Sequence, residues 1–328
     1  MKSRNLLTKA TEWIGNYEAG RHTGVLLWDL SAAFDTLNVD TFCQKLAIYG
    51  FQERSVRWFR TFLMNRQQRV HIEGEFSEEI KTSTGSPQGS LLSPLIFLIY
   101  IADIELWVDG ISIHGYADDT QSSFSSADED EVVKKLEEEA KRMLKFMASN
   151  SLSANPHKTG FMIIRSGKSS MSSQRSILVG DERIPEMKHH KILGVTVNNT
   201  LSWTDHVYGR GGVISSVNQR IGALKRLSYN IPKKYLPQIS NSIVTSKLRY
   251  GLAVYGSVRM SDSDPKTQQQ RDLQVALNKA MRIVMKVRLA DRVPIQELCD
   301  YTGALTVNQM CCEDQLRLIW NSLRDESS

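Results

Sequence analysis

A short apolar run that ends in a carboxylate lies near the start of the chain. Val25-Leu26-Leu27-Trp28 directly precedes Asp29, and a continuous apolar run of this length is typical of a strand buried at the centre of a sheet. A second carboxylate pair, Asp118-Asp119, lies between two strand-like stretches of residues 111–124, which predicts a hairpin. If these strands are neighbours, three carboxylates meet at one edge of a sheet.

The rest of the pattern predicts an α+β chain in which an antiparallel sheet, with helices packed on one face, is followed by a mainly helical part. Helical periodicity covers residues 40–49, 53–65 and 128–149. Further strands are expected at 161–164 and 192–197, and a hairpin around Glu73-Gly74-Glu75. We predict four regions, with finger-like helices and a hairpin at about 40–84: a lead-in at 1–22, a sheet domain at 23–200, a basic helical domain at 201–265 and a helical C-terminal region at 266–328.

Basic residues are concentrated in the third of these regions. The net charge of the 328 residues is only +5, yet no Asp or Glu occurs between Asp205 and Asp262, where nine Lys and Arg residues fall. Runs of one sign usually face polyanions, so this segment predicts nucleic-acid binding. A solvated helical face is the alternative.

No feature of the sequence points to export or to a membrane. The first ten residues lack the apolar core of a signal peptide. The longest apolar stretch, Leu91 to Leu106, is interrupted by polar residues and is shorter than the roughly 20 apolar residues that span a bilayer, so we expect a buried helix there. The four cysteines show no zinc-ligand spacing. We therefore expect an intracellular protein, nuclear or cytoplasmic, that is not secreted.

The three carboxylates Asp29, Asp118 and Asp119 predict a metal site. Like charges at such short range repel unless cations neutralise them, and two divalent ions held by carboxylates are the usual solution for in-line phosphoryl transfer. Mg²⁺ suits a site of a few carboxylates, water and phosphate oxygens. The alternative is that Asp118-Asp119 is an ordinary turn dipeptide.

Five segments resemble, in order, the polymerase motifs of non-LTR (LINE-type) retrotransposon reverse transcriptases. They are LWDLSAAFD at residues 27–35, SPQGSLLSP at 86–94, YADD at 116–119, SANPHKT at 153–159 and ILGV at 192–195. The resemblance covers about residues 5 to 322 and implies a polymerase palm followed by a helical thumb and a further helical region.

The resemblance also implies roles for individual residues. Asp29, Asp118 and Asp119 would hold two Mg²⁺ ions, with Mn²⁺ as a possible substitute, and would be catalytic. Phe34 would select deoxynucleotides by excluding a 2′-hydroxyl, although an ordinary core aromatic is the alternative. The other implied nucleotide contacts are Leu30, Pro87, Gln88, Gly89 and Lys158, the last beside the departing pyrophosphate. The implied primer and template contacts are Tyr116, Leu193, Gly194, Arg220, Lys225, Arg226, Lys233 and Lys234. Leu193-Gly194 would form a turn that grips the primer strand, although packing in the core is the alternative.

The implied partners are an RNA template, a DNA primer and deoxynucleoside triphosphates, with no membrane. Only 28 residues precede Asp29, so we expect the chain to lack most of the fingers and the endonuclease region of a full-length element, and to extend a primer slowly by itself. An RNA-directed DNA polymerase is the leading hypothesis. A catalytically inactive remnant that only binds nucleic acid is the alternative.

Overall fold

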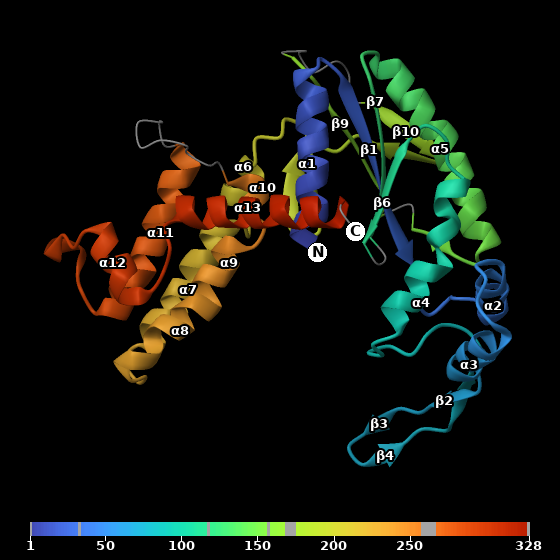
Figure 1. The fold of residues 1–328 in the computed structure, drawn as a ribbon, viewed down its shortest axis with the longest axis horizontal. Helices are drawn as coiled ribbons and strands as arrows, with labels where there is room; N and C mark the ends of the chain where they lie inside the picture. Colours follow the sequence, from blue (N-terminus) through green and yellow to red (C-terminus); the bar gives the residue numbers. More distant parts are fainter. Residues whose placement is uncertain are drawn as a thin grey trace. The chain divides into compact units, whose positions relative to one another are not determined.

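The computed structural model describes residues 2–31, 34–116, 119–155, 158–167, 175–256 and 267–326. The chain divides into two compact units (Figure 1). Residues 15–188 form the sheet unit, and residues 1–14 together with 189–328 form the helical unit. The four regions expected from the sequence are finer than this division and stay predictions.

The sheet unit is built on five antiparallel strands: β1 (His22–Ser31), β6 (Ser112–Tyr116), β7 (Asp119–Ser126), β8 (Ser153–Ala154) and β9 (Gly160–Ile164). Strand β1 is central, because it pairs with β7 on one side and with β8 and β9 on the other, while β6 extends the sheet beyond β7. The apolar run from Val25 to Trp28 is buried within β1, which confirms the predicted central strand.

Helices and short strand pairs complete this unit. The helices are α2 (Val39–Ile48), α3 (Glu53–Leu63), α4 (Ser93–Tyr100), the 3₁₀ turn η1 (Ala102–Leu106) and α5 (Glu129–Ser149). The strand pairs are β2 (Arg66–Gln68) with β5 (Ile80–Thr82), β3 (His71–Ile72) with β4 (Glu75–Phe76), and β10 (Ser176–Val179) with β11 (Glu182–Pro185).

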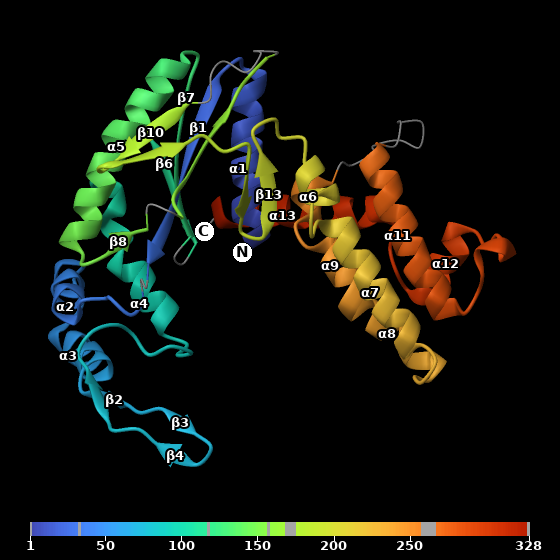
Figure 2. The ribbon, with the colours of Figure 1, turned by 180° about the vertical axis from the view of Figure 1, so that it is seen from behind.

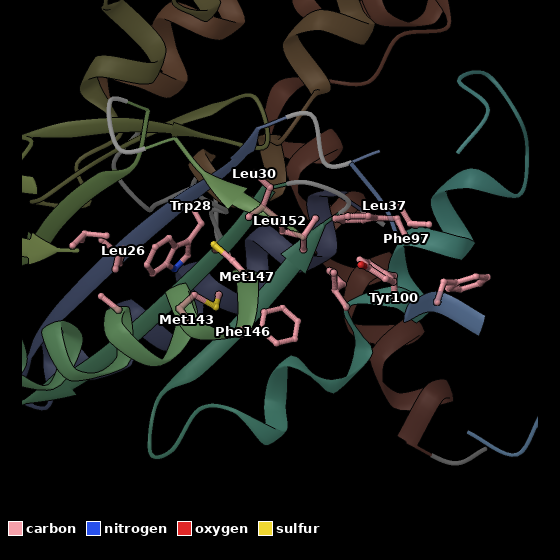
Figure 3. Close-up of a cluster of buried hydrophobic side chains, with 14 of the residues drawn as sticks. Leu26, Trp28, Leu30, Leu37, Phe97, Tyr100, Met143, Phe146, Met147 and Leu152 are labelled. Atoms are coloured by element: carbon pink, nitrogen blue, oxygen red, sulfur yellow. The ribbon is translucent and has the colours of Figure 1, made fainter. Parts of the chain in front are cut away.

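Helix α5 packs against one face of the sheet (Figure 1). Alternate residues of β1 point to opposite faces, and Leu26, Trp28 and Leu30 enter the same core cluster as the apolar side of α5. Figure 3 shows this core, in which Trp28 faces Met143 and Met147 of α5. The helix comes so close to β1 that a Cβ on Gly24 would fall 2.6 Å from Leu136 Cδ1, so only glycine fits there.

An ion-pair network fastens the start of α5 to the sheet. Arg165, which follows β9, donates to Glu129 in the first turn of α5 and to Glu186 after β11. The Arg165 side chain is 12% exposed, and the two carboxylate side chains are 13% and 7% exposed. Burial alone would raise the pKa of Glu129, but the hydrogen bonds and charge of Arg165 outweigh it and lower that pKa.

The helical unit contains one strand pair and a series of helices (Figure 2). The strands are β12 (His189–Ile192) and β13 (Val195–Asn198). The longer helices are α1 (Lys2–Glu18), which crosses the division, α7 (Val213–Leu227), α11 (Gln268–Met285), α12 (Ile295–Thr302) and α13 (Val307–Glu326). The short ones are α6 (Thr204–Tyr208), η2 (Lys233–Tyr235), α8 (Leu236–Ser240), η3 (Asn241–Thr245), α9 (Ser246–Arg249), α10 (Leu252–Tyr255) and η4 (Leu289–Asp291).

The core of the helical unit is separate from that of the sheet unit. Apolar residues of α7, among them Val217 and Leu224, pack with Leu277 and Met281 of α11 and with Met310 of α13. An antiparallel sheet with packed helices, followed by a helical part, is therefore present, which confirms the predicted α+β class.

Two local predictions were wrong. Residues 192–197 do not form one strand, because Leu193 and Gly194 have positive φ angles of 47° and 86° and turn the chain between β12 and β13. The stretch from Leu91 to Leu106 is not one buried helix. It breaks at Ile101, Leu91 is 97% exposed, and α4 buries only one side. No helix among the described residues is long and apolar enough to span a membrane.

Candidate active site

Two of the three predicted carboxylates lie opposite each other across paired strands. Asp29 of β1 is the register partner of Asp119, the first residue of β7, and Asp119 also faces Tyr116 at the end of β6. Directly opposite residues of an antiparallel pair point to the same face, with Cβ atoms roughly 5 Å apart. Trp28 points to the α5 side, so Asp29, Asp119 and Tyr116 occupy the other face. Asp118 lies outside the described residues.

This edge of the sheet is accessible and formally negative. Asp119 is exposed, and the Asp29 side chain is 38% exposed. The Lys158 ammonium lies 3.7 Å from Asp29 Oδ2, with its side chain 64% exposed, so solvent screens this pair and it contributes at most about 1 kcal/mol. A hydrated divalent cation would suit two carboxylates at one accessible edge of a sheet.

The loop after β8 is folded against the same end of β1. The backbone N–H of Asn155 donates to the carbonyl oxygen of Asp29 at 3.0 Å. The backbone N–H of Lys158 donates to the carbonyl oxygen of Asn155 at 3.0 Å. These bonds explain how Lys158, distant in sequence, reaches Asp29. They place Asn155 and Lys158 beside the end of β1.

The glycine-rich loop at residues 85–89 lies against the chain that follows β1. The N–H of Ser86 donates to the carbonyl oxygen of Phe34 at 2.7 Å. Gly85 has φ +77°, and a Cβ there would fall 2.7 Å from the carbonyl oxygen of Asp35. Only glycine permits so close an approach. The loop is also fixed at its other side, because Ser93 Oγ donates to the Pro87 carbonyl at 2.7 Å.

The predicted nucleotide contacts differ in accessibility. Phe34 is partly buried and packs on Phe97 with ring centroids 5.0 Å apart. The side chain of Leu30 is buried in the core, 7% exposed, so a nucleotide could contact this residue through its backbone only. Gln88 is exposed, and its amide donates to both carboxylate oxygens of Asp35, at 3.0 and 3.3 Å. Gly89 has open space beside it.

The hairpin turn of β12 and β13, at Leu193-Gly194, is held within the helical unit. The hydroxyl of Tyr250 donates to the Leu193 carbonyl at 2.5 Å. Leu193 has a left-handed φ, which is strained for a bulky residue, and its side chain is buried. The next strand is fixed as well, since the N–H of Thr196 donates to Nδ1 of His206 at 3.1 Å.

His206 is a buried neutral imidazole. It is 5% exposed and packs against the Tyr255 ring at 4.8 Å between centroids. Burial, with smaller contributions from Lys247 and Lys191, lowers its pKa to about 4. Its Nε2 is buried without a hydrogen-bond partner, so the ring supports the hairpin through Nδ1 alone.

The basic residues predicted to hold a primer and template are exposed but not equivalent. Lys225 and Arg226 lie at the end of α7. Arg220 donates to the Ile243 carbonyl at 2.8 Å. Lys233 lies over the Tyr301 ring and Lys234 over the Tyr235 ring. Another cation of the acid-free segment, Arg249, pairs with Asp314 and Glu313 and so stabilises the fold.

Two residues near these sites were missed by the sequence reasoning. Asp35 was part of the first motif but received no role, although it is the partner of Gln88. Tyr250 carried no signal, because its contact with Leu193 spans 57 residues. Among the described residues, no three His, Cys, Asp or Glu side chains form a group that could hold a metal. Asp118 would have to complete the set.

Residues 4–197, more than half of the chain, match the family model described as reverse transcriptase (RNA-dependent DNA polymerase). The chain belongs to this family. The matched residues contain all five segments that carried the resemblance and the whole sheet of the sheet unit. The search of curated proteins gave no match.

Solved structures of telomerase are similar to this reverse transcriptase chain at low identity. Telomerase from Candida tropicalis with the TWJ fragment of telomeric RNA is 12% identical, with a TM-score of 0.45 and coverage of 91% of this chain and 53% of that one. The apo form from the same organism is 12% identical, with a TM-score of 0.44 and coverage of 86% and 51%. This chain spans about half the length of these telomerase chains.

Proposed function

We propose that this chain is an RNA-directed DNA polymerase of a non-LTR retrotransposon, which extends a DNA primer on an RNA template. The observation that carries the proposal is the meeting of four motifs around the end of β1. The first motif pairs with the third through Asp29 and Asp119, contacts the second through Phe34 and Ser86, and approaches the fourth through Lys158.

The reaction needs a site that binds phosphates and stabilises the charge that develops on them. The primer 3′-hydroxyl oxygen forms a bond to the α-phosphorus, the bond from that phosphorus to the bridging oxygen breaks, and pyrophosphate leaves. Two Mg²⁺ ions, held by Asp29, Asp118 and Asp119, would activate the hydroxyl and neutralise the triphosphate. The accessible, formally negative sheet edge supports this assignment.

The chain's own side chains would complete the site. Lys158 is exposed and close to Asp29, so it can reach the leaving pyrophosphate, donate a hydrogen bond and supply a proton. The Asp35 carboxylate orients the amide of Gln88 toward the nucleotide. Phe34, braced by Phe97, supplies the bulk that excludes a 2′-hydroxyl. Tyr116 and the turn at Leu193-Gly194 would contact the primer, and the basic helices would hold the template-primer backbone.

The test is primer extension with an RNA template, a DNA primer and Mg²⁺, using deoxynucleotides or ribonucleotides. We expect RNA-templated extension by deoxynucleotides. The Phe34→Val chain should incorporate more ribonucleotide relative to deoxynucleotide, because the steric penalty is removed. Binding of the template-primer without any extension by the parent chain would favour the inactive remnant instead. An unchanged incorporation ratio would remove Phe34 from sugar selection.

A further inference from the structure

A groove of about 750 Å³ lies in the helical unit, between the C-terminal end of α7 and one side of α11. Figure 2 shows these two helices side by side. A volume of this size falls within the usual range of ligand pockets. Only Lys225, among the groove residues, was predicted from the sequence to bind nucleic acid.

The charge of the groove has one sign. Lys225, Lys279, Arg282, Lys286 and Arg288 line it, and no acidic residue does. Lys279 and Arg282 lie three residues apart on α11 and so share one side of that helix, and Lys286 is the residue that caps its C-terminal end. In the part of the chain that the structure describes, the side chains of these five residues form no ion pair.

One of these cations has an unsatisfied donor. Nε of Arg282 is buried and has no hydrogen-bond partner, which is unfavourable unless a ligand supplies an acceptor. The nearest acid on the following segment, Asp291, accepts from the backbone N–H of Arg288. That bond caps a 3₁₀ turn and does not neutralise the groove.

The walls of the groove are apolar and exposed. Tyr229 is 76% exposed, Leu289 is 74% exposed and Val275 is 50% exposed. A tyrosine ring and apolar side chains beside several cations form the combination that binds single strands, in which cations hold phosphates and bases stack on aromatic side chains. In a duplex the bases are paired and stacked on each other, so no base would be free to stack on the Tyr229 ring.

We propose that this groove binds an unpaired segment of RNA. Lysine and arginine side chains contact successive phosphates, and Tyr229 stacks on a base. The identity of the strand as RNA rests on the proposed function, in which the template is RNA and its unpaired part must be held outside the duplex. The groove is thus a site for single strands, apart from the backbone contacts that would hold the template-primer duplex.

The experiment measures binding of a short single-stranded RNA and of a blunt RNA–DNA duplex to the full chain, without Mg²⁺ or nucleotides. In Lys279→Gln/Lys286→Gln, the negative slope of log affinity against log salt for the single strand should become shallower by about 1.4. The matched control is Lys134→Gln/Lys141→Gln, which removes the same charge from exposed positions of α5 and should leave the slope unchanged.

The stacking part is tested at Tyr229. Tyr229→Ala should weaken single-strand binding roughly 5- to 100-fold, while Tyr229→Phe, which keeps the ring, should bind as the parent does and duplex affinity should not change in either. The proposal would be overturned if Lys279→Gln/Lys286→Gln and its α5 control changed the salt slope equally. It would also be overturned if Tyr229→Ala and Tyr229→Phe lost the same single-strand affinity. Because no nucleotide is present, these outcomes are independent of whether the chain extends a primer.

Discussion

The two units use their cations in opposite ways. In the sheet unit, Arg165 is 12% exposed and shared between the carboxylates of Glu129, which is largely buried, and Glu186, which is buried, so its charge holds secondary-structure elements together. In the helical unit, the lysines along the α7–α11 groove are exposed and face no carboxylate within that groove. Arg249, which pairs with Asp314, is an exception there. A charge that is compensated serves the fold, whereas an uncompensated one is available to a ligand.

The pattern of carboxylates differs in the same way. Asp29 and Asp119 face each other at the end of paired strands, and the exposed Lys158 lies 3.7 Å from Asp29. Such an arrangement contributes little to stability, since like charges directly opposite each other are destabilising. The sheet unit thus keeps the ion-pair network of Arg165 beside α5, and it keeps Asp29 and Asp119 opposite each other at the candidate site.

The largest effect on stability is expected at Arg165. Arg165→Met should leave one buried and one largely buried carboxylate without their main partner, and the free energy of unfolding should fall by roughly 3–5 kcal/mol. The control is Arg57→Met. Its pair with Glu53 is largely exposed, so the loss should stay below about 1 kcal/mol. Urea unfolding of the three chains measures both values. Equal losses would mean that the distinction between compensated and exposed pairs is wrong.

A smaller, pH-dependent effect is expected at His206. Its pKa is about 4 in the fold, against an ordinary value of 6.5, so the unfolded chain binds more protons between these values. The contribution of His206 to stability is complete above about pH 6.5 and is lost as the pH falls toward 4, by roughly 3 kcal/mol.

The measurement compares urea unfolding of the parent and of His206→Gln at pH 7 and pH 4.5. The parent should lose more stability than the variant over this interval. His189→Gln, at an exposed position of β12, is the control and should follow the parent. Parallel curves for the parent and His206→Gln would show that this imidazole titrates normally.

The smallest effect on stability is expected at Tyr250. Tyr250→Phe removes one hydrogen bond to the Leu193 carbonyl and should cost about 1 kcal/mol. If the turn at Leu193-Gly194 contacts the primer, the dissociation constant of the template-primer should also rise, because the strained turn is less well held. Stability and duplex binding are measured on the same preparation. A variant that loses stability but binds like the parent would limit Tyr250 to a structural role.

The central strand and the long helices of the sheet unit could be predicted because their apolar spacing is local. Val25 to Trp28 and the apolar side of α5 are both read from neighbouring residues. The apolar pattern predicted one strand at residues 192–197, because it continues through Leu193-Gly194. Only the family resemblance implied a turn there, since positive φ angles leave no mark on an apolar pattern. Strands β10 and β11, of four residues each, were not predicted.

The candidate site was predicted in part for a similar reason. The positions of Asp29 and Asp119 at strand ends could be predicted from the sequence. That the two strands pair, with Asp29 opposite Asp119, was only a condition of the prediction, and the structure supplies it. The approach of Lys158 to Asp29 depends on backbone bonds of Asn155, and the contact of Gln88 with Asp35 depends on the close packing at Gly85. Both join segments distant in the sequence. The groove was not predicted because four of its five cations follow Asp262, where the acid-free segment ends.

The most direct test of the account is to remove the carboxylate charge and measure chemistry and binding separately. Asp29→Asn and Asp118→Asn should lower single-turnover extension at saturating RNA template and DNA primer by at least about 100-fold, while duplex affinity stays within about two-fold of the parent. Asp128→Asn is the matched control, because this residue caps α5 and Asn caps equally well. Extension by the two variants at the parent's rate would contradict the claim that this sheet edge is the catalytic site.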